Sequence, residues 1–288
     1  MKDTLLCLGL SYCAQHLALH VLRAGMKVAG TSRDIETCHH WQGGGVEMHL
    51  WDAAAPLPLS FLEKATHLLL SIPPDTDGDP VIRLHEEWLK TQTTLQWVGY
   101  LSSTGVYGDH GGAWVDEATI CKPATERGKR RLAAERQWLA LHESCELPIH
   151  VFRLSGIYGP GRSALDDVRA GTARRILKEG HVFSRIHVED IAAALLASIQ
   201  KPSPGAVYNV ADNLPAPQHE VVEYACNLLG VAPPPLQPLD AVDMSPMARS
   251  FYEANRRVSN RKLIDELGVR LTYPDYKKGL EALLASKN

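Results

Sequence analysis

Gly9-Leu-Ser-Tyr-Cys-Ala14 is a stretch whose residue types suit the binding of a pyrophosphate. Gly9 ends a short apolar run and a helical pattern follows, so backbone amides at the start of that helix would face an anion. In the pattern Gly-x-Gly-x-x-Gly, Ser11 and Ala14 stand at the second and third glycines. Ala14 is compatible with helix–strand packing, whereas Ser11 would be strained if its φ were positive. A plain tight turn between a strand and a helix is the alternative interpretation.

The end of the second apolar run, Thr31-Ser32-Arg33, indicates which dinucleotide would bind. An NAD site usually has Asp or Glu there to bind the ribose hydroxyls. Ser32 followed by Arg33 suits the 2′-phosphate of NADP instead, because a guanidinium pairs with phosphate and a carboxylate would repel it. We therefore predict NADP as the cofactor, with NAD less favoured. The alternative is a solvated Arg33 that pairs with its neighbour Asp34.

A third candidate is the segment Tyr100-Leu-Ser-Ser-Thr-Gly-Val-Tyr-Gly108, which closes another apolar run. It presents the hydroxyls of Ser102 and Ser103 at the end of a predicted strand. Ligands of parallel sheets bind outside the carboxyl ends of the strands. Ser103 therefore lies where a ligand is expected.

The apolar periodicity that must position these residues alternates between strands and helices. Strands as apolar as these suit a sheet that is buried on both faces. We predict an α/β fold, a Rossmann-type doubly wound parallel sheet with a small C-terminal α/β lobe. The core would comprise residues 1–155, with 187–212 returning to it, and the substrate lobe residues 156–186 and 213–288. The predicted strands are 4–8, 27–31, 46–50, 67–72, 95–102, 149–154 and 206–210; the predicted helices are 14–24, 81–91, 124–142, 164–178, 187–199, 215–230, 258–267 and 276–285.

Composition narrows the class of protein. The 288 residues are 45% hydrophobic and 22% charged, with a net charge of −3, so nothing favours nucleic-acid binding. Apolar runs fall short of the roughly 18 residues of a membrane span, and no signal peptide is evident, so we expect a cytoplasmic protein. The six cysteines include no Cys-x-x-Cys pair and indicate reduced thiols. Cys38-His39-His40 cannot easily converge on one ion, so no metal is predicted.

Three further motifs give the chain a resemblance to a known family. They are Ser102-Ser103-x-x-Val106-Tyr107-Gly108, Arg153-Leu-Ser-Gly-Ile-Tyr-Gly-Pro160 and His187-Val-Glu-Asp190. With the Gly9 turn, their order resembles the extended and atypical short-chain dehydrogenases/reductases. More narrowly, the chain resembles the NAD-dependent epimerase/dehydratase family over nearly its whole length.

The resemblance implies a role for each matching position. Ser103 would be the catalytic hydroxyl, and Tyr107 would shape the pocket or act as a second candidate. His187 would be structural or would face the substrate. The cofactor would be held by Gly9, Ser11, the amides of Tyr12 and Cys13, Ser32, Arg33, Asp52 at the adenine, Ser71 and Ile72 at the ribose, Ser102, and Leu154 at the nicotinamide.

The chain departs from the family at the proton relay, which is normally a Tyr followed four residues later by a Lys. The matching positions are Arg127 and Arg131. Arginine stays protonated near neutral pH and cannot act as a general acid or base. Two arginines spaced i, i+4 would instead make a helix face cationic and could hold a substrate or another anion. The alternatives are a solvated basic face partnered by Glu126 and Glu135, or replacement of the tyrosine by Tyr107, Tyr158 or Lys129, with Asp109 and His110 in the following loop.

Three functions remain open. The first is an NADP-dependent oxidoreductase or epimerase with a nonstandard acid, acting on an unknown small molecule. The second is a non-catalytic NADP-binding sensor or regulator, and the third is an apo scaffold with a decayed site. The resemblance also implies a possible homodimer, paired through the helix that carries Arg127.

Overall fold

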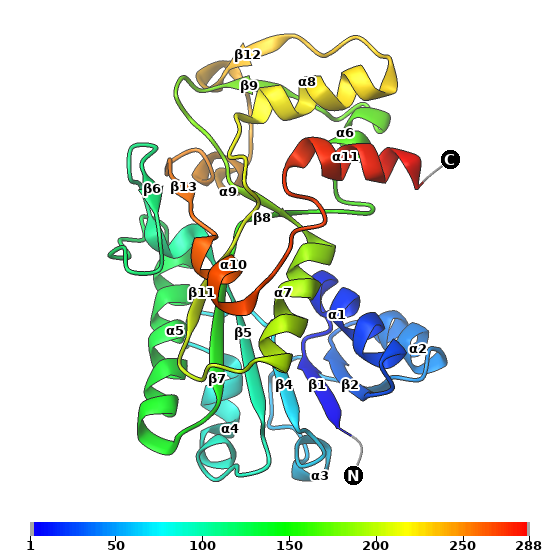
Figure 1. The fold of residues 1–288 in the computed structure, drawn as a ribbon, viewed down its shortest axis with the longest axis vertical. Helices are drawn as coiled ribbons and strands as arrows, with labels where there is room; N and C mark the ends of the chain where they lie inside the picture. The colour runs from blue at the N-terminus through cyan, green and yellow to red at the C-terminus, as the bar shows by residue number, and fades with distance from the viewer. Residues whose placement is uncertain (1–2, 287–288) are drawn as a thin grey trace. The chain divides into compact units, whose positions relative to one another are not determined.

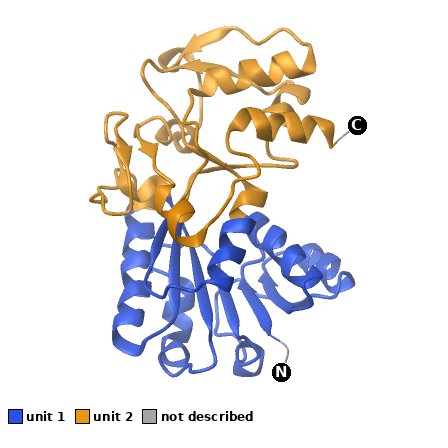
Figure 2. Cartoon of the chain, viewed as in Figure 1, with its two compact units in different colours: residues 1–103, 129–153, 192–208 blue, residues 104–128, 154–191, 209–288 orange. Residues whose placement is uncertain are grey.

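The computed structural model describes residues 3–286, which belong to two compact units (Figure 2). The first unit runs over residues 1–103, 129–153 and 192–208, and the second over 104–128, 154–191 and 209–288. The residue bounds predicted for the core and the substrate lobe describe functional parts, so the compact units do not test them.

A seven-stranded sheet organises the first unit, with the strand order β11-β7-β5-β4-β1-β2-β3 (Figure 1). β1 pairs in parallel with β2 and with β4, β2 pairs in parallel with β3, and β4 with β5. The order reverses between β1 and β4, and this reversal is the point at which doubly wound sheets bind ligands. The strands are β1 (Thr4–Leu8), β2 (Lys27–Ser32), β3 (Glu47–Leu50), β4 (His67–Leu70), β5 (Trp97–Ser103), β7 (Ile149–Leu154) and β11 (Val207–Val210), whose last two residues belong to the second unit.

Helices cover both faces of this sheet. One face packs its buried side chains against α3 (Leu59–Leu62), α4 (Pro80–Lys90) and α5 (Glu126–Cys145). The opposite face is covered by α1 (Tyr12–Arg23) and α7 (Val188–Gln200), where Trp97 Nε1 donates to Ser198 Oγ at 3.0 Å. α2 (Ile35–Gly43) packs against β3 at the sheet edge. The predicted Rossmann-type doubly wound fold is confirmed.

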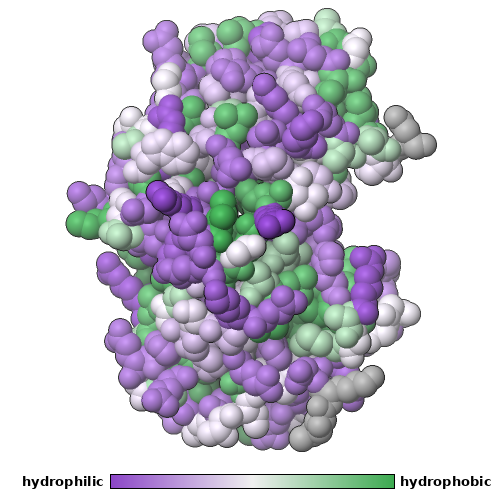
Figure 3. Space-filling view, viewed as in Figure 1, coloured by the Kyte–Doolittle hydropathy of each residue, from purple (hydrophilic) through white to green (hydrophobic). Residues whose placement is uncertain are grey.

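The surface agrees with this layering. Hydrophilic side chains predominate over the side of the first unit seen in Figure 3, as expected where helices screen a sheet from water. Within residues 3–286, no helix is long and apolar enough to cross a membrane.

The second unit is built from short elements around two small cores. Its strands form three parallel pairs, β8 with β10, β9 with β12 and β6 with β13. One core joins α6, α8 and α11, and the other lies near β9. The elements are β6 (Trp114–Val115), β8 (Gly156–Tyr158), α6 (Ala164–Arg169), β9 (Arg175–Leu177), β10 (Arg185–His187), α8 (Gln218–Leu229), β12 (Leu236–Pro238), α9 (Pro246–Ser250), β13 (Arg257–Val258), α10 (Arg261–Leu267) and α11 (Tyr276–Ala285), with 3-10 turns at Thr104–Tyr107 and Leu239–Ala241.

Several predicted elements were wrong in extent. The helix expected over 164–178 ends at Arg169, because Gly171 takes a φ of +68° and the chain then forms β9. The helix expected over 258–267 begins only at Arg261, after the short strand β13. α2 was not predicted at all, since only Cys38 among its residues is buried and its apolar pattern is weak.

One close contact fixes α11 in the second unit. The ring of Tyr158 lies over Gly279, and a Cβ added at Gly279 would sit 2.1 Å from the Tyr158 hydroxyl oxygen. That hydroxyl donates to the Asp275 carbonyl at 3.3 Å, at the start of the same helix. Only glycine therefore lets α11 approach this ring.

Gly279→Ala should destabilise the protein by about 1–3 kcal/mol, since overpacking outweighs the higher helix propensity of alanine. Urea unfolding followed by circular dichroism measures the change. Gly43→Ala, in α2 with no heavy atom within 4 Å of the added Cβ, is the matched control and should be neutral or slightly stabilising. Equal free energies of unfolding for the two variants would contradict the tight contact.

Candidate functional site

Gly9, which follows β1, adopts a backbone conformation that other residues rarely take. Its φ is +83°, and an added Cβ would lie 2.9 Å from Ile72 Cγ1 and 3.0 Å from Ser71 Oγ. The Ser71 hydroxyl donates to the Gly9 carbonyl, and the Gly9 amide donates to Thr31 Oγ1 at 2.8 Å. The ends of β1, β2 and β4 are thus tied together at the reversal of strand order.

Ser11 has no strain at the second glycine position of the pattern. It is the N-cap residue of α1, with φ −71° and ψ 172°, and its side chain does not cap the helix. The first turn carries no acidic residue. The start of α1, with Tyr12 and the buried Cys13, is therefore electrostatically open to an anion.

Arg33 projects from the turn after β2. Its side chain is exposed, and within residues 3–286 no hydrogen bond or ion pair holds it. The alternative pairing with Asp34 is not formed, because Asp34 caps α2 through the amides of Glu36 and Thr37. Ser32 accepts from the Asp34 amide at 3.1 Å.

The predicted adenine position lies beyond β3. Asp52 is exposed, and its Oδ1 accepts from the Ala54 amide at 2.9 Å. Ala53 between them has a φ of +65°, so this is a tight, locally strained turn. Within residues 3–286, no hydrogen bond engages the second carboxylate oxygen of Asp52.

A buried ion pair lies beneath the end of β5. Glu135 of α5 is 1% exposed, and its Oε2 accepts from Arg153 Nη2 at 2.8 Å and from Arg153 Nε at 3.2 Å. The Ser102 hydroxyl donates to the other oxygen, Oε1. Glu135 is therefore not a partner of a solvated basic face. Ser102 is committed to this network, and the half-buried Ser103 follows it.

Arg131 is anchored to the same strand one turn earlier along α5. Its Nη1 donates to the Leu101 carbonyl at 2.8 Å and to the Tyr100 hydroxyl at 3.2 Å. The guanidinium carbon lies 5.6 Å from the centre of the Tyr100 ring. Burial raises the pKa of the Tyr100 hydroxyl, so Tyr100 stays a neutral partner. Arg127 is exposed, whereas Arg131 is a fixed positive charge at the end of β5.

In the second unit, the candidate replacements for the missing tyrosine are engaged elsewhere. Tyr107 is fully buried, and its hydroxyl donates to Asn209 Oδ1 at 2.8 Å. Burial raises the pKa of Tyr158, which packs against Gly279. Lys129, in the first unit, is exposed.

The loop and motif residues of the second unit are held by backbone groups. Asp109 accepts from the amides of Asn255 and Gly111, which lower the pKa of its carboxyl. His187 is 2% exposed, and its Nδ1 accepts from the Glu189 amide at 3.2 Å. Its ring packs against Tyr158 and Tyr273, at centroid distances of 5.1 and 3.9 Å. These contacts favour a structural role for His187.

Leu154 is the last residue of β7 and Ser155 follows it, and both belong to the second unit. Leu154 is buried, and the Ser155 amide donates to the Val210 carbonyl at 3.0 Å. The Ser155 hydroxyl is buried without a hydrogen-bond partner in the described chain. Ser155 was not singled out from the sequence, although its position after an apolar strand was a usable signal.

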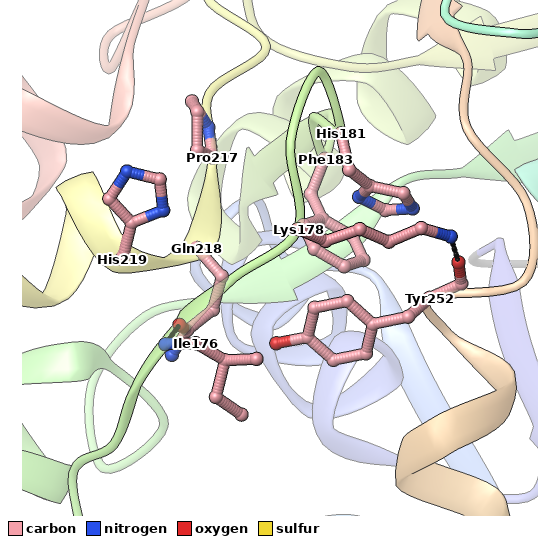
Figure 4. A pocket seen from close by; sticks show the side chains of 8 residues that line it. All are labelled: Ile176, Lys178, His181, Phe183, Pro217, Gln218, His219 and Tyr252. Carbon is pink, nitrogen blue, oxygen red and sulfur yellow. Dashed lines mark hydrogen bonds between the residues drawn. The ribbon is translucent and has the colours of Figure 1, made fainter. Parts of the chain in front are cut away.

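A shallow crevice with no room for a water molecule also lies in the second unit (Figure 4). The rings of His181, Phe183 and Tyr252 pack against one another at centroid distances of 4.6, 5.6 and 5.2 Å. Lys178 Nζ donates to the Tyr252 carbonyl, and burial lowers the pKa of His181. The crevice is thus part of the small aromatic core near β9. Its lining residues are Ile176, Lys178, His181, Phe183, Pro217, Gln218, His219 and Tyr252, none of which was a predicted site residue.

Glu135→Ala should cost about 3–5 kcal/mol of stability, because it leaves the buried Arg153 guanidinium without its carboxylate. Urea unfolding monitored by tryptophan fluorescence measures the loss. Glu143→Ala, at an exposed position of the same helix, is the control and should stay within about 0.5 kcal/mol of wild type. A Glu135→Ala protein as stable as this control would show that the pair adds nothing.

Known proteins share this arrangement. The family model described as the NAD dependent epimerase/dehydratase family matches residues 81–211. A solved protein of unknown function from Silicibacter pomeroyi is 48% identical, with full coverage of both chains and a TM-score of 0.92. The dTDP-glucose 4,6-dehydratase of Bacillus anthracis, solved in complex with NAD, shares the fold with a TM-score of 0.80 at 18% identity, covering 100% of this chain and 97% of its own.

Among curated proteins, a 3-diazoavenalumate denitrifying reductase from Streptomyces is 29% identical over 150 residues. That match covers 48% of this chain and 47% of the reductase. With the sheet order, the Gly9 turn and the matched motifs, these similarities agree with the resemblance seen in the sequence. Over the matched residues 81–211, the chain belongs to the NAD-dependent epimerase/dehydratase family.

Proposed function

We propose that this protein is an NADP-dependent oxidoreductase. The observation that carries the proposal is the Gly9 turn, where the absence of a Cβ keeps the end of β1 against Ser71 and Ile72 at the reversal of strand order. In such folds the first glycine lets the chain turn tightly from the strand into the helix whose N-terminus faces the pyrophosphate. The structurally similar dehydratase of Bacillus anthracis was solved with NAD. Arg33, which pairs with no other residue of the described chain, supports NADP here.

The residues that would hold NADP are those predicted from the sequence. The bound cofactor would supply a hydride, and the chain's own groups would bind and orient it. They are Gly9, Ser11, Tyr12 and Cys13 at the pyrophosphate, Ser32 and Arg33 at the 2′-phosphate, Asp52 at the adenine, Ser71 and Ile72 at the ribose, and Leu154 at the nicotinamide, whereas the hydroxyl of Ser102, also predicted, is engaged by Glu135.

The arginines favour reduction over epimerisation. Epimerisation through a ketone begins with removal of a hydroxyl proton, which needs a general base, and protonated Arg127 and Arg131 cannot take it. Reduction of a carbonyl acceptor would add the hydride of NADPH to carbon and a proton from solvent to oxygen, and the anchored Arg131 can stabilise the negative charge that develops on that oxygen. The partial similarity to a reductase supports the same direction. Ser103 is the hydroxyl we assign to the substrate, and Arg127 and Arg131 are the groups we assign to the substrate or an anion, whereas the buried Tyr107 and His187 are engaged within the second unit.

A non-catalytic NADP-binding sensor or regulator is the second candidate function. The observation that favours it is the Tyr107 hydroxyl, which is buried in a bond to Asn209. In either case we propose a small-molecule ligand, no nucleic acid or membrane partner, and a cytoplasmic location. A homodimer paired through α5 stays a prediction, and the exposed Arg127, Lys129 and Arg136 would make that interface polar.

Arg33→Ala should weaken NADPH binding by about 10- to 100-fold while changing NADH binding less than about threefold, since only NADPH carries the 2′-phosphate. Isothermal titration calorimetry with both nucleotides measures this. Arg23→Ala, an exposed arginine at the far end of α1, is the control. Equal losses for both nucleotides would contradict the assignment of Arg33 to the 2′-phosphate.

Ser103→Ala should lower the rate of NADPH oxidation about 100-fold, the usual effect of losing one hydrogen-bond donor to a developing negative charge. The measurement is NADPH absorbance at about 340 nm across a panel of carbonyl and other electrophilic acceptors, with the exposed Ser60→Ala as control. If wild-type protein binds NADPH but oxidises it with no acceptor, the sensor function replaces the oxidoreductase.

A further inference from the structure

The turn between β2 and α2 brings opposite charges next to each other. Arg33 is followed directly by Asp34, and both side chains are exposed. A carboxylate free to move at this position would pair with the guanidinium or repel a phosphate bound to it. In NAD sites, an acid near the end of this strand binds the ribose hydroxyls instead. The orientation of Asp34 therefore bears directly on the choice between the two nucleotides.

Asp34 is turned away from Arg33 by three bonds to α2. Its Oδ1 accepts from the Glu36 amide at 3.3 Å, and its Oδ2 accepts from the Thr37 amide at 3.0 Å. The Thr37 hydroxyl donates to the same Oδ2 at 2.5 Å. Both carboxylate oxygens are thus directed to the start of the helix, where the helix dipole favours negative charge.

The Thr37 hydroxyl is the only side-chain group among these three donors. The hydroxyl bond is also the first cause of the lowered pKa of the Asp34 carboxyl, followed by the Thr37 amide. Thr37 itself is half-buried in the first turn of α2, where its position is fixed by the helix. Thr37 lies outside the sequence motif of the cofactor turn, so it was not among the predicted site residues.

We propose that Thr37 is a specificity-determining residue, whose hydroxyl holds the Asp34 carboxylate on α2 and so leaves Arg33 available for the 2′-phosphate of NADP. This inference rests on the proposed function, because it concerns the cofactor that the oxidoreductase uses. Thr37 acts through Asp34 and touches no cofactor atom. It is a positioning residue, and its effect should appear in the ratio of the two nucleotide affinities.

The test compares Thr37→Val, which is close in shape but has no hydroxyl, with Thr37→Ser, which keeps the hydroxyl. Calorimetry on the full chain gives the dissociation constants for NADPH and NADH. We expect Thr37→Val to lower the preference for NADPH by about three- to tenfold, the usual worth of one hydrogen bond to a charged group at an exposed site. Thr37→Ser should stay within about twofold of wild type.

The same substitution in an Asp34→Asn background separates charge from helix stability. Asparagine caps helices as well as aspartate does, so α2 keeps its cap while the negative charge is gone. Thr37→Val should then leave the nucleotide preference unchanged. A drop of the same size in the Asp34→Asn background would overturn the inference, because the effect would come from α2 and not from the carboxylate.

A readout independent of binding completes the test. NMR titration of the Asp34 carboxyl should show its pKa rising toward the ordinary value in Thr37→Val and not in Thr37→Ser. If the pKa of the Asp34 carboxyl or the preference for NADPH is unchanged in Thr37→Val, the role of Thr37 is overturned. The proposed function still stands in that case, provided that the wild-type protein binds NADPH. Wild-type protein that binds neither nucleotide would overturn both.

Discussion

The cofactor half of this protein depends on the approach of the chain at Gly9 to the end of β4. The left-handed backbone there brings the Gly9 carbonyl to the Ser71 hydroxyl and its amide to Thr31. Three strand ends are joined at one point, and α1 leaves that point with its first turn free of acidic side chains. A Cβ at Gly9 would press on the side chains of Ser71 and Ile72, so the lack of a side chain permits both this close approach and the left-handed backbone of the turn.

The sheet could be predicted from the sequence because its signal is local. β1, β4, β5 and β7 are continuous apolar runs, and each is buried along nearly its whole length. The short strands of the second unit carry no such signal. β9 was taken for helix because it owes its conformation to pairing with β12, about 60 residues later in the chain. α2 is mostly polar, and its one local signal, the N-cap residue type of Asp34, was not used.

The parts of the candidate site that depend on backbone conformation could be predicted from the sequence. The hydrogen-bond partners of its side chains were harder to predict. The Gly9 turn and Arg33 followed from residue type. The partner of Glu135 could not be predicted from residue type, since a carboxylate among Arg127, Arg131 and Arg136 is typical of a basic surface. Its spacing from Ala134 and Trp138, both buried, was the signal that it faces the sheet. Arg131 therefore has two roles. Its Nη1 binds β5, and the rest of its guanidinium places positive charge near Ser103.

The close fit at Gly279 sets an order of events during synthesis. The core of the second unit that contains Tyr158 is completed by Tyr276, Leu280 and Leu283, all on α11, the last helix of the described chain. Tyr158 therefore leaves the ribosome more than a hundred residues before the helix that covers its ring. Until α11 emerges, Tyr158 has only part of its native surroundings, the ring of His187 and the side chains of α6 and α8, so one apolar face of the nascent second unit stays uncovered until that helix is made.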